Sequence, residues 1–204
     1  MIPPRYDRSV RLMSWLAAIL LIAAMAVGLQ LDFATRTQPV LVSLVPTVFK
    51  ARAYAPLALA DLTDNEVNRA RAHAISLVRR RPIPAETLSI LALSEYEAHP
   101  TVASQAMVAS ASRGWREPIA QSALMQAALA AKDWKVLAER LDALERINRD
   151  DLVPATIWEP LLAQPRGREA IADRLSQDRN WLNRFLRMGG AEIEASSFAE
   201  TIVL

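Results

Sequence analysis

The sequence predicts an all-α protein in which one N-terminal transmembrane helix precedes a short α-solenoid of helical hairpins. Three observations predict this class. Residues 12–31 carry no charge over twenty consecutive positions. From residue 61 onward, apolar residues recur at helical spacing between short polar or proline-containing turns. The chain of 204 residues contains only five glycines, which is typical of helices rather than of β-sandwiches or nucleotide-binding loops.

The uncharged segment Leu12–Leu31 has the length of a membrane span. At 1.5 Å per residue it forms a helix of about 30 Å, which matches the hydrocarbon core of a bilayer. Arg5, Arg8 and Arg11 precede it and favour a cytoplasmic location for residues 1–11. We therefore expect a single-pass protein of the bacterial inner membrane with a periplasmic C-terminal domain.

Other interpretations of this segment stay open. Arg36, Lys50 and Arg52 follow the span and oppose this orientation. A cleaved signal peptide is an alternative, with Ala24-Met25-Ala26 as its cleavage site, although twenty apolar residues favour retention. A third interpretation is a helix buried in a soluble core.

One side of the span is formed by small residues, Ala17, Ala24 and Gly28. Small residues let helices approach closely in a bilayer. We expect this side to pack against a helix of a membrane partner, with lipid around the rest.

Residues 32–60 are apolar but interrupted by Pro39, Pro46 and Pro56, which prevents a second spanning helix. The segment 38–49 either lies along the membrane surface, packs on the body, or forms a partly ordered linker with short helical turns. We favour the linker. Its residues from Val40 to Val45 are apolar enough that we expect them to contact another part of the protein.

A repeat follows in residues 61–188. Pro82, Pro118 and Pro154 are 36 residues apart, and the residues that follow them also recur. We expect each unit to be a helical hairpin, with Asp61 or Asp64 capping the first helix. The turns within the hairpins are expected at Ala98–Thr101 and at Lys132-Asp133. The helix Trp134–Ile147 is expected to be the second helix of its hairpin.

This pattern resembles the tetratricopeptide repeat (TPR) family. Ala92 and Ala128 match the small residue of that family's first helix, Leu88 and Leu124 match its bulky early position, and the three prolines match its closing proline. The period is two residues longer than the family's 34, and Tyr96 falls one position late for its aromatic. The resemblance implies a TPR-like stack that binds other proteins.

The chain is expected to end with a closing helix and a tail. The closing helix, Asn180–Met188, has Asp178 as its cap and Gly189-Gly190 as its end. Its apolar face comprises Trp181, Leu182, Phe185 and Leu186. Residues 189–204 form an acidic and apolar tail that we expect to be disordered; the alternative is a C-terminal peptide that docks on a partner.

No catalytic, cofactor-binding or metal-ligating residue is predicted. The sequence lacks cysteine and the common catalytic motifs, and neither His73 nor His99 is expected to have a carboxylate or a second histidine at ligand spacing. The residues after the span carry no net charge, which argues against nucleic acid as a partner. No small-molecule substrate is evident, and an enzyme is not expected.

The sequence therefore predicts a membrane-anchored protein-protein interaction scaffold. Trp115, between Arg113 and Arg116 in a glycine-containing loop, is the candidate partner-binding site. Resemblance to Ala-rich, membrane-tethered repeat proteins implies partners in cell-envelope biogenesis, such as machinery for polysaccharide synthesis or export. The alternatives are a structural accessory subunit that contacts an integral membrane complex through its span, and an enzyme acting on envelope glycans, for which no carboxylate pair is evident.

Overall fold

A computed structural model describes residues 6–147, 153, 155–177, 181–183, 185, 186 and 195–203. Throughout these residues the regular structure is helical, as predicted, and none of them lies in a strand. The chain forms two compact units, residues 1–83 and 84–204. Each unit is described by itself below.

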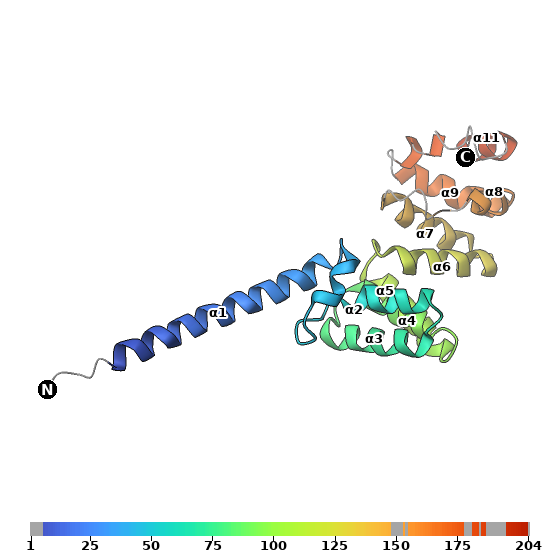
Figure 1. Ribbon diagram of the computed structural model, residues 1–204. Helices are drawn as coiled ribbons and strands as arrows, with labels where there is room; N and C mark the ends of the chain where they lie inside the picture. The colour runs from blue at the N-terminus through green and yellow to red at the C-terminus, as the bar shows by residue number, and fades with distance from the viewer. Residues whose placement is uncertain are drawn as a thin grey trace. The chain divides into compact units, whose positions relative to one another are not determined.

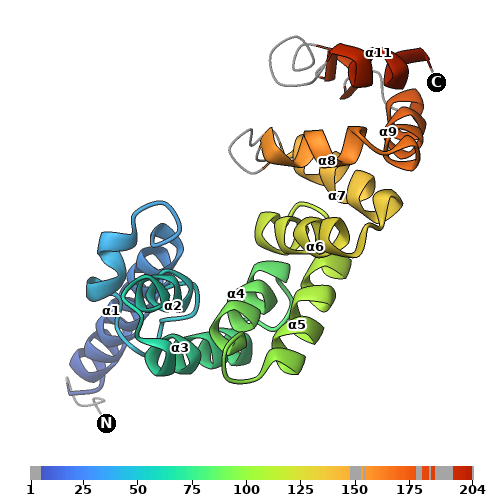
Figure 2. The ribbon, with the colours of Figure 1, turned by 90° about the vertical axis from the view of Figure 1, so that its right-hand side faces the viewer.

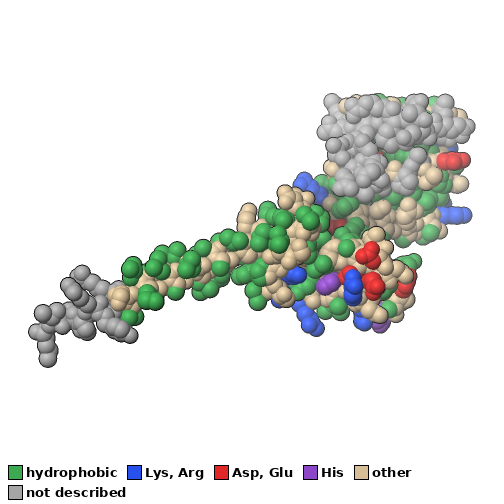
Figure 3. All heavy atoms as spheres, in the orientation of Figure 1, with side chains coloured by type: hydrophobic (Ala, Val, Ile, Leu, Met, Phe, Trp, Pro, Cys, Tyr) green, Lys and Arg blue, Asp and Glu red, His purple; other side chains and the backbone are tan. Residues whose placement is uncertain are grey.

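Unit 1 begins with the long helix α1 (Tyr6–Ala34), which extends the predicted span at both ends (Figure 1). Its segment Ser9–Ala34 is long and apolar enough to cross a membrane, and only 6% of its most apolar 18-residue window is buried. Figure 3 shows hydrophobic side chains along the helix. This exposure contradicts the interpretation of α1 as a helix buried in a soluble core. The large exposed side chains are Val10, Leu12, Met13, Trp15, Leu16, Ile19, Leu20, Leu21, Ile22, Met25, Val27, Leu29 and Phe33.

Residues 35–53, which we call the collar, fold back onto the end of α1. Their regular element is the 3₁₀ helix η1 (Pro39–Leu44), in agreement with the short helical turns that we expected. Val42, Val45 and Ala53 form a small core with Leu31, Phe49 and Leu57 packed against it. The residues from Val40 to Val45 were expected to contact another part of the protein. Val42 and Val45 do so, while Val40 and Leu44 remain exposed.

A helical hairpin of α2 (Tyr54–Thr63) and α3 (Val67–Arg80) completes unit 1. This hairpin begins at Tyr54, before residue 61, where the helical-repeat region was predicted to start. Asn65 turns the chain with a φ of 61°, a value that asparagine tolerates better than most residues. The predicted cap is wrong, because the cap residue of α3 is Glu66 and its side chain makes no capping hydrogen bond.

Unit 2 contains two helical hairpins, one after Pro82 and one that begins at Pro118. Helices α4 and α5 pack against each other, as do α6 and α7, and α5 contacts α6 (Figure 2). The turn at Lys132-Asp133 lies where the sequence placed it, and Pro118 is the first residue of α6. Proline is favoured there because its fixed φ suits the first helical position and its missing N–H is not needed. The bounds are α4 (Ala85–Glu95), α5 (Pro100–Arg113), α6 (Pro118–Ala131) and α7 (Trp134–Arg146).

The main core of unit 2 joins α6 and α7 to the helices that follow. These are η3 (Ala155–Ile157), α8 (Trp158–Leu162) and α9 (Pro165–Gln177). Trp158, only 1% exposed, packs against Phe185 with ring centroids 5.7 Å apart. The largest fully buried side chains of this core are Trp158, Phe185, Met125, Leu137, Leu141, Leu144, Ile157, Leu161, Leu162 and Ile171.

The predicted closing helix is described at residues 181–183, 185 and 186, which are helical. Trp181 and Phe185 are buried as predicted, whereas Leu186 is 44% exposed. Leu182 is partly buried against the same core. The other residues of that prediction lie outside the described residues, as do residues 1–5 of the N-terminal segment and the third repeat proline. The residues concerned are Pro154, Asp178, Asn180, Met188, Gly189 and Gly190.

The C-terminal tail contains a helix, α11 (Ala195–Val203), so the expected disorder is wrong for these residues. Phe198 stacks on Phe185 at 5.3 Å. Thr201 is buried, and Glu200 pairs with Arg168 at 2.7 Å. Burial of one side of α11 against α8 and α9 explains why so short a segment is helical.

Candidate interaction surfaces

The carboxylate of Asp32 joins α1 to the collar. Its Oδ1 accepts the backbone N–H groups of Ala51 and Ala53, both at 2.9 Å, and its Oδ2 accepts that of Arg52 at 3.0 Å. These donors immediately precede α2, where backbone N–H groups have no helical partner. Asp32 is only 5% exposed. A charged residue near the end of the predicted span thus serves to hold the start of α2.

Phe49 of the collar covers Gly28 of α1. A methyl group added at Gly28 would overlap the aromatic ring, so only glycine admits Phe49 in this position. The predicted helix-packing side is therefore only partly available: Gly28 is buried by its own chain, while Ala17 and Ala24 remain exposed. Only the N-terminal part of that side is therefore accessible for the close helix packing that the sequence predicted.

A second buried carboxylate, Asp61, links α2 to α3. Its Oδ1 accepts hydrogen bonds from Nε and Nη2 of Arg69, at 3.1 and 2.6 Å, and its Oδ2 lies 2.6 Å from Nδ1 of His73. Burial raises the pKa of Asp61, but the bonds from Arg69 and His73 outweigh it, so the pKa lies below its ordinary value. The His73 ring packs on Tyr54, with centroids 5.8 Å apart. This cluster was not predicted, and the expectation that His73 has no carboxylate partner is wrong.

His99 also has a carboxylate partner that was not predicted. Its Nδ1 lies 2.6 Å from Oε2 of Glu95, four residues earlier. This spacing brings two side chains together at a helix end and could have been recognised. Within the described part of the chain, however, no group of three His, Asp or Glu side chains gathers at metal-binding distance.

Glu117 organises a buried polar cluster where α4, α5 and α6 meet. Its Oε2 accepts hydrogen bonds from the Ala120 N–H and from the Ser89 hydroxyl, both at 2.6 Å. Ser89 Oγ is 2.7 Å from Ser110 Oγ, and Ser110 donates to the Ala85 carbonyl at 2.8 Å. The carboxylate and both hydroxyls are buried, so this cluster caps and aligns helices rather than presenting a surface.

The predicted partner-binding loop lies on the surface of unit 2. Trp115 is 46% exposed, and the guanidinium of Arg116 lies 4.5 Å above its ring. Arg113 is the last residue of α5 and is exposed. An exposed tryptophan covered by an arginine is the kind of rigid anchor that protein interfaces use.

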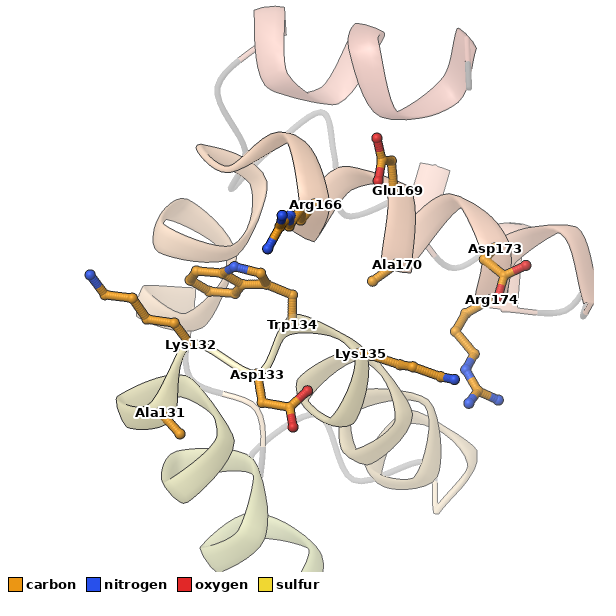
Figure 4. Close-up of a pocket in the computed structure, with 10 residues that line it drawn as sticks. All are labelled: Ala131, Lys132, Asp133, Trp134, Lys135, Arg166, Glu169, Ala170, Asp173 and Arg174. Carbon is orange, nitrogen blue, oxygen red and sulfur yellow. The ribbon is translucent and has the colours of Figure 1, made fainter.

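A larger candidate surface is an open cleft of about 740 Å³ between the α6–α7 turn and α9. Figure 4 shows Trp134 in its middle, with the guanidinium of Arg166 directed toward the indole. The lining residues are Ala131, Lys132, Asp133, Trp134, Lys135, Arg166, Glu169, Ala170, Asp173 and Arg174. The Trp134 ring is partly buried and also packs against the core of unit 2.

Local contacts determine the shape and charge of this cleft. Lys132 ends α6 with a φ of 56°, and Asp133 caps α7 by accepting the Val136 N–H at 3.2 Å. Arg174 is held by Glu139 at 2.7 Å. The lining combines both signs of charge around one aromatic ring, a surface suited to a polar segment of another protein.

Comparison of the chain with protein-family models, with curated proteins and with solved structures finds no match.

Proposed function

We propose that the protein is a single-pass, membrane-anchored scaffold for protein-protein interaction, with the body on the periplasmic side of a bacterial inner membrane. The observation that carries this proposal is α1, whose apolar side chains are exposed over its length while its C-terminal end is held in a folded unit. Exposed apolar surface of this extent requires an apolar surrounding. A bilayer supplies one for a helix of this length.

The scaffold role rests on the helical hairpins of unit 2. We propose that they stack as a TPR-like solenoid and bind other proteins through exposed surfaces rather than through a catalytic cleft. Trp115 with Arg113 and Arg116, and the cleft around Trp134, are surfaces of unit 2 that each place an aromatic ring beside basic groups. The proposed partners are membrane or periplasmic proteins of a cell-envelope complex, with polysaccharide synthesis or export as the setting.

Anchoring and orientation can be tested together because the chain has no native cysteine. Single cysteines at exposed positions, Asn68 in unit 1 and Val108 in unit 2, would be probed in intact cells with a membrane-impermeant maleimide. The proposal expects labelling from the periplasm and retention of the protein in membranes after alkaline carbonate washing. Intact mass distinguishes retention from cleavage after Ala26, and a cleaved, carbonate-soluble product would contradict the proposal.

The accessory-subunit alternative differs in which part contacts the partner. Ala17 and Ala24 remain exposed on α1 and favour it. The test replaces residues 12–27 by an unrelated apolar helix and keeps the segment that contacts the collar. A scaffold should retain its crosslinked partner, whereas an accessory subunit should lose it.

Photocrosslinking residues can then locate the contact surface. One placed at Trp115 or Lys132 should crosslink the same partner, while one at exposed Tyr96 serves as the matched control. Crosslinking only from α1 would refute the scaffold role and support the accessory subunit.

A further inference from the structure

The collar exposes apolar side chains beside the end of α1. Phe33 at the end of the helix is 53% exposed, and in the collar Leu44 is 63%, Val48 is 72% and Val40 is 80% exposed. Single exposed apolar residues are common on protein surfaces. Three such residues lie within nine collar residues, next to a helix that is itself exposed. Figure 3 shows hydrophobic side chains along α1 and over the segment at its end.

The position of this surface relative to the span follows from contacts within unit 1. Phe49 lies on Gly28, and Leu31 packs into the collar core. Asp32 is bonded to the backbone of residues 51–53. At 1.5 Å per residue these anchor points cover about 6 Å of α1. They coincide with the last turn of a twenty-residue span that begins at residue 12.

The charge of the collar fits the same position. Residues 35–53 contain three basic residues, Arg36, Lys50 and Arg52, and no acidic residue. The Arg52 guanidinium lies 4.7 Å from the centroid of the Phe33 ring. Aromatic rings and long basic side chains are enriched where the hydrocarbon core meets the headgroups, because one part of each is apolar and another is polar.

We infer that the collar sits in the phospholipid interface, with Val40, Leu44 and Val48 in contact with acyl chains and the basic residues at the level of the phosphates. This inference rests on the proposed membrane anchoring by α1. Because the collar is fixed to α1 at Gly28, Leu31 and Asp32, a bilayer around the span must end close to it. Unit 1 is then partly embedded in the membrane surface and is not connected to the span by a flexible linker.

The test uses the full chain reconstituted into phosphatidylcholine vesicles that contain phosphatidylglycerol. Single cysteines at Val40, Leu44 and Val48 carry an environment-sensitive nitrobenzoxadiazole group. Leu20 in the middle of α1 serves as a buried reference, and Asn68, near the opposite end of α2, serves as a water-exposed control. Lipids brominated either near the headgroup or deep in the acyl chain report the depth of each probe.

The collar probes should be quenched, and more strongly by the shallow than by the deep bromine, because interfacial side chains lie about 5–10 Å into the boundary of headgroups and acyl chains. The Leu20 probe should show the reverse order and the Asn68 probe no quenching. Val40→Glu with Val48→Glu should abolish quenching at position 44 and leave it unchanged at position 20. The same pair should leave carbonate resistance intact.

Three outcomes would contradict the inference or the anchoring on which it rests. Quenching at position 20 without quenching at the collar would overturn the interfacial seat and leave the anchor standing. A blue-shifted collar probe that no lipid quenches would also overturn it, because the apolar surface would then be covered by protein. Loss of quenching at position 20 as well would refute the membrane anchoring on which the inference rests.

Discussion

Removal of the Asp32 carboxylate should open the collar. In Asp32→Ala three backbone N–H groups lose their acceptor. A hydrogen bond to a charged group contributes about 1.5–3 kcal/mol. Water can reach the part-buried N–H groups of Ala51 and Arg52 but not the buried one of Ala53. The expected loss is therefore about 3 kcal/mol rather than the sum of three full bonds.

Peptide-resolved hydrogen exchange of the full chain in nanodiscs measures this loss directly. A cost of about 3 kcal/mol corresponds to exchange about a hundredfold faster in residues 51–58. Asp32→Asn keeps the Oδ1 acceptor used by Ala51 and Ala53 and replaces Oδ2, which faces Arg52. It should therefore cost less, about 1–2 kcal/mol.

The matched control is Asp64→Ala in the same unit. Asp64 is exposed and no side-chain hydrogen bond holds it in the described part of unit 1, so its loss should change exchange by less than about threefold. If Asp32→Ala also stayed within that range at residues 51–58, the carboxylate would not be what holds the collar on α1.

Three further predictions concern the buried contacts. The pKa of Asp61 lies below its ordinary value of 3.8, so its contribution to stability is fully present above pH about 5 and is lost as the pH falls through the lowered pKa. Urea titrations at pH 6, 4 and 3 should show this loss of stability. Asp61→Asn should make the stability less dependent on pH over the same range. Gly167→Ala should destabilise unit 2 by about 1–3 kcal/mol, since the added methyl would overlap the Leu161 carbonyl; an unchanged urea midpoint would contradict this. Glu117→Ala should cost about 2 kcal/mol by removing the α6 cap and the acceptor of Ser89, whereas Glu117→Gln should cost less because its amide oxygen can still accept both hydrogen bonds. The same urea midpoint measures both variants, and equal losses would contradict this prediction by showing that a neutral acceptor cannot replace the carboxylate.

The periodic features of this chain could be predicted from sequence because each depends on local composition. A run without charge specifies an apolar helix wherever it is placed. The prolines 36 residues apart and the Lys132-Asp133 turn mark helix ends through backbone geometry alone. The all-helical class, the apolar N-terminal helix and the hairpins at residues 85–146 follow from such local rules.

The polar contacts behind the candidate surfaces depend on residues that are distant in the chain. Asp32 meets backbone groups 19 to 21 residues away, and Asp61 meets His73 at a separation of 12. No helical or strand period relates such positions, so a buried carboxylate resembles any exposed one in the sequence. The helix α11 likewise depends on packing against α8, α9 and the ring of Phe185, which a local pattern does not reveal.

Composition and period by themselves therefore determined what kind of element each stretch forms and where an apolar anchor lies. Tertiary structure alone decided which faces of those elements are used. Gly28 belongs to a small-residue stripe by sequence, yet the ring of Phe49 covers it, while Val40 and Val48 belong to an apolar run of which only Val42 and Val45 are buried. The physical reason is that burial depends on which partners the fold brings together, and this is a property of the packed chain rather than of any segment within it.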